Sequence, residues 1–176
     1  MRSDILLVAV GGQNVKPYLD FFFGYAKSKG DYYKVTVEKG RSKEKCVERY
    51  SIHIGGGAGD ITEGNADVTI ALEQLEGVRH RNYSREEGAT LVSEKRIIPI
   101  SVLSRVAAYP ENAFQKCVND CFRVYKFDES DHIFACLLAL KVLGIEKDDL
   151  IAYGEKTNLY TKEDVERVFA AKPVKA

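Results

Sequence analysis

The residues best suited to chemistry come directly after the first apolar run of the chain, where residues 5–14 read ILLVAVGGQN. Gly11 and Gly12 have no Cβ, so the N–H groups of a turn here can closely approach a phosphate, a carboxylate or a partner's backbone. Gln13 could contact a substrate or a neighbouring chain, or simply be solvated. Asn14 could cap the helix that follows. The predicted cofactor-binding residues are therefore Gly11, Gly12, Gln13 and Asn14.

Two well-defined phosphate motifs are not satisfied. A dinucleotide-binding turn requires Gly-x-Gly-x-x-Gly, and residues 11–16 read GGQNVK, without the second and third glycines. Residues 55–59 read GGGAG but lack the Gly-Lys-Ser/Thr ending of a Walker loop, which favours a loop between strands. Two interpretations of the first turn stay open. Either it holds an anion with its backbone donors and the helix dipole, or it only packs the strand against the helix.

The remaining chemical side chains predict neither a catalytic centre nor a metal site. The three histidines, His53, His80 and His132, have no second ligand at metal-binding spacing. The four cysteines include no CxxC pair, which favours reduced thiols over a disulfide framework or an iron–sulfur cluster. Cys117 and Cys121, four residues apart, are expected to lie on one helix face as half-buried thiols.

The charge balance excludes recognition by a global field. Lys and Arg together number 26, as do Asp and Glu, so no nucleic-acid partner is expected. The locally basic segment 39–49 is either a solvated loop or a contact for an anionic cofactor tail or an acidic partner surface. The first apolar run has only six residues, too few for a secretory signal or a membrane span, so we expect a cytoplasmic protein without membrane contact.

The elements around the first turn follow from hydrophobic spacing. The unbroken apolar run 5–10 predicts a strand covered on both faces, as in a parallel sheet. Pro17 fits the first turn of the next helix and Gly30 fits its end. Its predicted apolar face consists of Val15, Tyr18, Leu19, Phe22, Phe23 and Ala26.

The rest of the chain alternates between strand-like and helix-like segments. Strands are predicted at residues 32–38, 49–54, 67–72, 88–93, 97–100 and 123–127, and helices at 73–81, 110–117, 131–143 and 161–171. The last helix opens with a capping box at Thr161. This pattern predicts one α/β domain over residues 1–176, with three layers, a mainly parallel sheet flanked by helices, and a Rossmann-like opening.

Three segments occur in the order typical of one protein family. Residues 8–14 read VAVGGQN, residues 61–80 read ITEGNADVTIALEQLEGVRH, and residues 88–101 read GATLVSEKRIIPIS. In this order the chain resembles the gamma subunit or gamma domain of the 2-oxoacid:ferredoxin oxidoreductases, whose substrates include pyruvate, 2-ketoisovalerate and indolepyruvate.

Two loops differ from that family's pattern. Asn14 replaces the last glycine of the family's GGQG turn; it tolerates left-handed backbone angles but adds a side chain. The family's second glycine-rich loop has Arg-Gly-Gly, where this chain has Glu44, Lys45 and Cys46. These replacements reverse one charge and remove two permissive backbone positions, so the loop cannot make its contact in the family's way.

The resemblance implies a subunit for the oxidative decarboxylation of a 2-oxoacid such as pyruvate or indolepyruvate, inactive in isolation. In the family, thiamine diphosphate and the iron–sulfur clusters belong to other subunits or domains. The expected partners are therefore thiamine-diphosphate-binding and ferredoxin-type subunits, with a homodimer when the chain is isolated and no cofactor bound by this chain alone. The alternative, motivated by the altered residues 44–46, is a stand-alone α/β binding protein for a phosphate- or diphosphate-containing ligand.

Overall fold

Six strands form one sheet in the computed structural model, which describes residues 2–40, 46–98, 103–105 and 107–174. The strands are β1 Ser3–Val10, β2 Tyr33–Lys39, β3 Val47–Ile54, β4 Ala66–Ala71, β5 Ser84–Ser93 and β6 Val124–Phe127. Their order across the sheet is β2-β3-β1-β4-β5-β6. The pairs from β1 through β4 and β5 to β6 are parallel, whereas β3 is antiparallel to both β1 and β2. The sheet is therefore mainly parallel, with an antiparallel hairpin at one edge.

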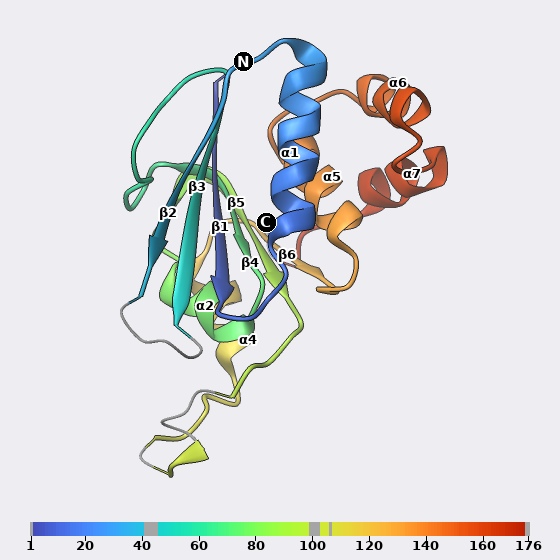
Figure 1. The fold of residues 1–176 in the computed structure, drawn as a ribbon. Coiled ribbons are helices and arrows are strands. Elements are labelled where there is room, and N and C mark those ends of the chain that lie inside the picture. The colour runs from blue at the N-terminus through green and yellow to red at the C-terminus, as the bar shows by residue number, and fades with distance from the viewer. Residues whose placement is uncertain (1, 41–45, 99–102, 106, 175–176) are drawn as a thin grey trace.

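Helices cover both faces of the sheet and give the fold three layers (Figure 1). The helices are α1 Lys16–Lys29, α2 Gln74–Arg79, α4 Ala113–Asp120, α5 His132–Val142, α6 Lys147–Thr157 and α7 Lys162–Ala170. α1 and α5 pack side by side on one face, with α6 and α7 next to them, and α2 and α4 pack together on the other face. This arrangement confirms the predicted three-layer α/β fold with its strand–turn–helix opening.

The burial of the central strand β1 explains the unbroken apolar run at residues 5–10, which follows Ser3 and Asp4 in the same strand. All eight of its residues are buried. Ile5 and Leu7 face the core formed with α1 and α5, whereas Leu6 and Val8 pack on the opposite face. Each fully buried aliphatic side chain contributes about 1.5–3 kcal/mol. The neighbours of β1 are the parallel strand β4 and the antiparallel strand β3. The apolar run therefore indicates that both faces of the strand are buried, but it does not show whether each neighbouring strand is parallel or antiparallel.

The first helix follows its predicted signals at one end but not at the other. Pro17 lies in the first turn, and Gly30 ends the helix in the left-handed conformation with φ +71°. The N-cap is Val15 without a side-chain hydrogen bond, so the predicted cap by Asn14 is wrong. Phe23, assigned to the apolar face, is 51% exposed and packs on Tyr33. The buried residues of α1 are Tyr18, Phe21, Phe22, Tyr25 and Ala26.

One predicted strand is wrong, and one helix was not predicted. Residues 97 and 98 are not in a strand, and residues 99 and 100 of that predicted strand lie outside the described part of the chain. Helix α6 was not predicted because few of its residues are buried and it therefore lacks a wide apolar face. The glycine-rich residues 55–59 belong to the loop between β3 and β4, as predicted.

Among the described helices, none is long and apolar enough to cross a membrane.

Helix α7 begins at the predicted capping box. The Thr161 hydroxyl accepts from the Asp164 N–H at 3.3 Å, and the Asp164 carboxylate accepts from the Thr161 N–H at 2.9 Å. Thr161→Ala should lower the free energy of unfolding by about 1 kcal/mol, because the helix loses its side-chain cap. Urea denaturation measures the loss. Thr161→Ser keeps the hydroxyl and should remain close to wild type; equal losses in both variants would contradict the assignment to the cap.

Candidate functional site

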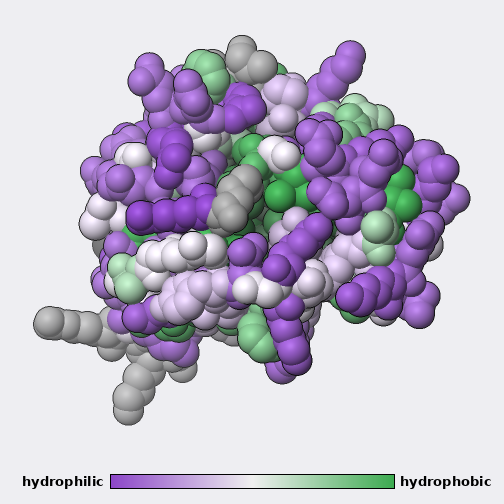
Figure 2. Space-filling model, turned by 90° about the horizontal axis from the view of Figure 1, so that it is seen from above, coloured by the Kyte–Doolittle hydropathy of each residue, from purple (hydrophilic) through white to green (hydrophobic). Residues whose placement is uncertain are grey.

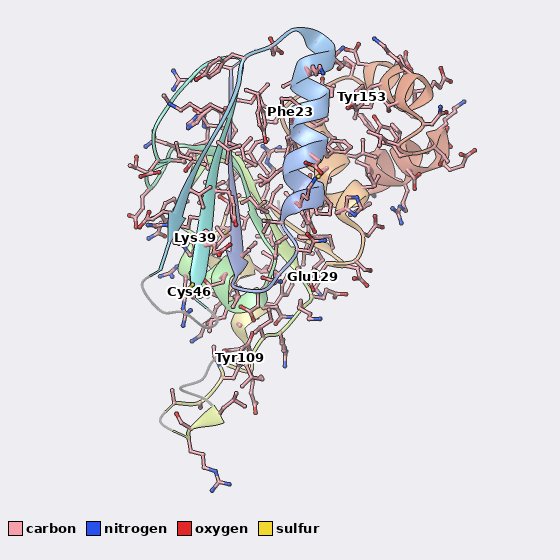
Figure 3. All side chains as sticks on the ribbon, in the orientation of Figure 1. Phe23, Lys39, Cys46, Tyr109, Glu129 and Tyr153 are labelled. Carbon is pink, nitrogen blue, oxygen red and sulfur yellow. The ribbon has the colours of Figure 1, made fainter. Side chains whose placement is uncertain are left out.

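The predicted site residues lie at the edge of the sheet where the parallel strands end. The chain leaves β1 toward α1 on one face and leaves the adjacent parallel strand β4 toward α2 on the other face. In open α/β sheets, ligands bind in the crevice at such a change of direction. Figure 3 shows Cys46 and Glu129 at the same end of the sheet, on either side of the end of β1. The turn after β1 therefore occupies the position that this architecture favours for binding.

The turn itself is tight and depends on one of its glycines. The Gln13 N–H donates to the Val10 carbonyl at 3.0 Å and closes the turn. Gly12 has φ +94°, where an L side chain would be strained, and nothing lies within 4 Å of a Cβ placed there. The N–H of Gly11 already donates to the Cys46 carbonyl at 2.7 Å. Gly12 and Asn14 are exposed, so these two residues form the accessible part of the predicted site.

The side chain of Gln13 is partly buried, and its amide bonds groups of the chain itself. Its Oε1 accepts from the Val10 N–H at 2.8 Å. Its Nε2 donates to the Leu72 carbonyl at 2.8 Å and to Glu129 Oε1 at 2.7 Å. One amide thus joins the end of β1, the end of β4 and the loop after β6. Gln13 fills the crevice between β1 and β4 and fixes the position of the turn.

The Glu73 carboxylate also bonds groups of the chain itself at this edge of the sheet, a role that the sequence did not predict. Its side chain is buried and caps α2 by accepting from the N–H groups of Leu75 and Glu76 at 2.7 and 3.1 Å. It also accepts from the Ile97 N–H at 3.2 Å and from the Tyr109 hydroxyl at 2.5 Å. The chain's own carboxylate therefore occupies the helix terminus that a phosphate would use. An acidic residue directly between a strand and a helix was the available signal.

A cavity of about 510 Å³ lies beside the turn. Its lining residues are Asn14, Pro17, Tyr18, Glu94, Lys95, Asp128, Glu129, Ser130 and His132. Three carboxylates line it against one lysine, and Lys95 Nζ lies 3.5 Å from Glu129 Oε2. The hydroxyl and N–H of Ser130 donate to Asp128 and lower the pKa of its carboxyl, which favours the ionised form. This charge distribution favours cationic groups over free phosphate.

The basic segment 39–49 is neutralised where it is described. Lys39 Nζ lies 3.1 Å from Glu48, and Arg49 pairs with Glu38 and donates to the Tyr83 hydroxyl. Residues 41–45, which include Glu44 and Lys45 of the altered loop, lie outside the described residues. Cys46 is described and its carbonyl receives the N–H of Gly11, so the altered loop connects directly to the first turn.

The histidines and the pair of thiols lie at separate places in the fold, and of those described below only His132 lies beside the turn. His53 lies near the start of β1, where its Nδ1 is 2.6 Å from Asp4 Oδ1 and its Nε2 is 2.9 Å from the Gly59 carbonyl. Figure 2 views that opposite edge, whose surface is mainly hydrophilic. His132 lines the cavity beside the turn. The sulfurs of Cys117 and Cys121 are 3.7 Å apart, but both thiols are buried, so the prediction that they are half-buried is wrong. Within the described ranges, no three His, Cys, Asp or Glu side chains form a group that could bind a metal ion.

The bridging role of Gln13 predicts a specific sensitivity to charge. Gln13→Glu should lower the free energy of unfolding at pH 8 by about 1–3 kcal/mol, because it removes both N–H donors and places a second carboxylate beside Glu129. Urea denaturation measures the loss, which should shrink at lower pH as the new carboxyl is protonated. Gln115→Glu makes the same change at an exposed position of α4 and should have little effect. A Gln13→Glu protein as stable as wild type would contradict the bridge.

Known proteins support the fold and the family resemblance. No family model matches the sequence. The chain is 31% identical over 112 residues to the indolepyruvate oxidoreductase subunit IorB of Archaeoglobus fulgidus, covering 63% of this chain and 56% of that protein. It is 26% identical over 126 residues to IorB of Thermococcus kodakarensis, covering 68% of this chain and 60% of that protein. The chain therefore spans little more than half the length of the curated relatives it matches.

Solved structures share the fold at low sequence identity. The pyruvate oxidoreductase subunit PORC of Thermotoga maritima superposes with a TM-score of 0.58 and 16% identity, covering 95% of this chain and 90% of that one. The gamma subunit of a keto/oxoacid ferredoxin oxidoreductase from Geobacter sulfurreducens gives a TM-score of 0.53 and 14% identity, covering 96% and 93%. The chain is thus a homologue of the IorB subunits with the fold of the gamma subunits of 2-oxoacid:ferredoxin oxidoreductases, as its motifs predicted.

Proposed function

We propose that this chain, over residues 1–176, is one gamma-type domain that serves as a subunit of a 2-oxoacid:ferredoxin oxidoreductase and is inactive alone. The observation that carries the proposal is the sequence similarity to IorB subunits, on a fold that gamma subunits of this enzyme class share. The substrate is a 2-oxoacid such as pyruvate or indolepyruvate. The complex is proposed to be cytoplasmic.

The proposed partners are a thiamine-diphosphate-binding subunit and a ferredoxin-type subunit, which would hold the thiamine diphosphate and the iron–sulfur clusters. The internal use of polar groups near the turn supports this division. The N–H of Gly11, the amide of Gln13 and the N-terminus of α2 all bind groups of the same chain. Backbone donors that are already engaged leave little for this chain to offer a cofactor by itself.

The predicted cofactor-binding role of Gly11, Gly12, Gln13 and Asn14 stays a prediction, and we propose it in a narrower form. Gly12 and Asn14 would border a cofactor or partner surface in the assembled complex. Their exposure and the space around Gly12 support this, and Gln13 would act only by holding the turn. The stand-alone phosphate-binding alternative is not favoured, because the relatives are oxidoreductase subunits and the adjacent cavity is lined by three carboxylates and one lysine.

Assembly can be measured directly. A tagged full-length chain, isolated from its native cells under gentle conditions, should recover thiamine-diphosphate and iron–sulfur subunits, identified by mass spectrometry and by the cofactors' absorbance. An unrelated tagged α/β protein provides the background control. Recovery of homo-oligomers alone would contradict the proposal.

The isolated chain should bind thiamine diphosphate no better than the millimolar range, because the Gly11 N–H, the Gln13 amide and the N-terminus of α2 bond groups of the chain itself. Isothermal titration calorimetry of the full-length chain with thiamine diphosphate, and with inorganic diphosphate for comparison, measures this. Micromolar binding of either compound would instead support the stand-alone binding protein.

A further inference from the structure

A second cavity, of about 210 Å³, lies on the other side of the sheet, between α2, the end of β2 and the start of β3. Its lining residues are Glu38, Gly40, Val47, Arg49, Glu76, Arg79 and His80. Gly40 and Val47 are the described residues at the two ends of the altered loop, and the Gly40 N–H donates to the Val47 carbonyl at 3.0 Å. None of the side chains that line this cavity belongs to the turn at residues 11–14.

Glu76 gives this cavity an unusual polar group. Its side chain is 2% exposed, and its Oε1 accepts from Arg79 Nη1 at 2.6 Å. Its Oε2 is buried and makes no hydrogen bond among the described residues, although His80 Nδ1 lies 3.5 Å from it, and no other buried side-chain N or O atom there lacks a hydrogen bond. Burial is the main cause that raises the pKa of the Glu76 carboxyl. An unpaired buried acceptor costs about 1–3 kcal/mol unless a donor reaches it.

His80 adds a second acceptor to the same cavity. Its Nδ1 lies 3.0 Å from the Glu76 carbonyl, which can only accept, so Nδ1 carries the proton of the neutral ring. Burial lowers the pKa of His80 and thereby favours this neutral form. Nε2 then carries a lone pair and can accept a hydrogen bond.

Arg79 supplies donors at the outer side of the cavity. A guanidinium has five N–H groups, and the contact with Glu76 uses one of them. Its side chain is 50% exposed, so the cavity opens to the surface at this residue. The lining charges balance, since Arg49 and Arg79 match Glu38 and Glu76 while His80 is neutral. The lining therefore has no net charge that would attract an ion, which favours a neutral ligand.

We propose that this cavity binds a primary amide, whose two N–H groups donate to Glu76 Oε2 and His80 Nε2 and whose carbonyl accepts from Arg79. A primary amide is the small neutral group that combines two donors with one acceptor. The volume suits a single side chain or a very small molecule, since sites for larger ligands measure about 300–1,000 Å³. The amide comes either from an Asn or Gln side chain of a partner chain or from a free small molecule.

Acetamide is the direct probe of this chemistry. Titration of the ¹⁵N-labelled full-length chain, followed by NMR, should give saturable shifts at the backbone amides of Gly40, Val47, Arg79 and His80. N,N-dimethylacetamide has the same carbonyl but no N–H group and should bind at least about tenfold more weakly. Equal, non-saturating shifts with both compounds would show only solvent effects and would overturn the proposal. This comparison uses the wild-type chain, so it does not depend on the folding of a variant.

A matched pair of variants tests the assigned acceptor. Glu76→Gln replaces an acceptor oxygen with an N–H donor and should weaken acetamide binding at least about tenfold, as expected for the loss of about 1.4 kcal/mol. Glu63→Gln makes the same change at an exposed residue away from the cavity and should bind like wild type. Acetamide affinity should also fall as the pH is lowered through the pKa values of Glu76 and His80, because the added protons remove acceptors. Unchanged binding in Glu76→Gln would overturn the assignment.

The two sources of the amide are distinguished in the assembled complex, and only this step rests on the proposed function. If a partner chain presents the amide, Glu76→Gln should reduce recovery of the partner subunits at least about threefold while Glu63→Gln does not. If the amide is a free molecule, recovery should be equal and the acetamide results should stand. Failure of the wild-type chain to recover any partner would contradict the proposed function alone.

Discussion

Burial of β1 on both of its faces is the constraint on which the other features of this protein depend. A strand with helices or loops on both sides must be apolar along its length, and its end must turn away without exposing the core. The chain meets this need with Gly12, whose left-handed backbone reverses direction in a few residues. The turn, the start of α1 and the crevice beside β4 are all placed by this one strand.

The polar side chains at that edge bond mostly to groups of the chain itself. Gln13 bridges β1, β4 and Glu129, while Glu73 caps α2 and also holds Ile97 and Tyr109. A crevice that in many α/β proteins is open to phosphate is here closed by side chains of the chain itself. This agrees with a subunit that supports an assembly more than with a protein that binds an anionic cofactor alone.

The two cavities differ because the sheet separates them. The larger one, beside α1 and α5, is lined by three carboxylates and one lysine, whereas the smaller one, beside α2, has equal numbers of acidic and basic residues and a buried oxygen that makes no hydrogen bond among the described residues. Asn14 of the first turn lines the larger cavity, and Gly40 and Val47, which flank the altered loop, line the smaller one. Groups that enter the two cavities would therefore contact opposite sides of the same edge.

The sequence determined what depends on local spacing. The apolar run of β1, the helix signals at Pro17 and Gly30, the capping box at Thr161 and the ordered family motifs all involve residues close together in the chain. Such features follow from backbone preferences and periodic burial, which a single sequence displays directly.

Only the tertiary structure decided the partners of the polar groups. Gln13 and Glu129 are 116 positions apart, and Glu73 and Tyr109 are 36 apart, so no local pattern pairs them. The sequence also did not show that Val15, and not Asn14, is the N-cap of α1. Nor did it show that β3 lies antiparallel beside β1. Hydrogen-bond partners and strand neighbours depend on which surfaces the folded chain brings together. The sequence therefore located the turn and the family resemblance, and the fold decided that Gln13 holds the turn and that Glu73 caps α2.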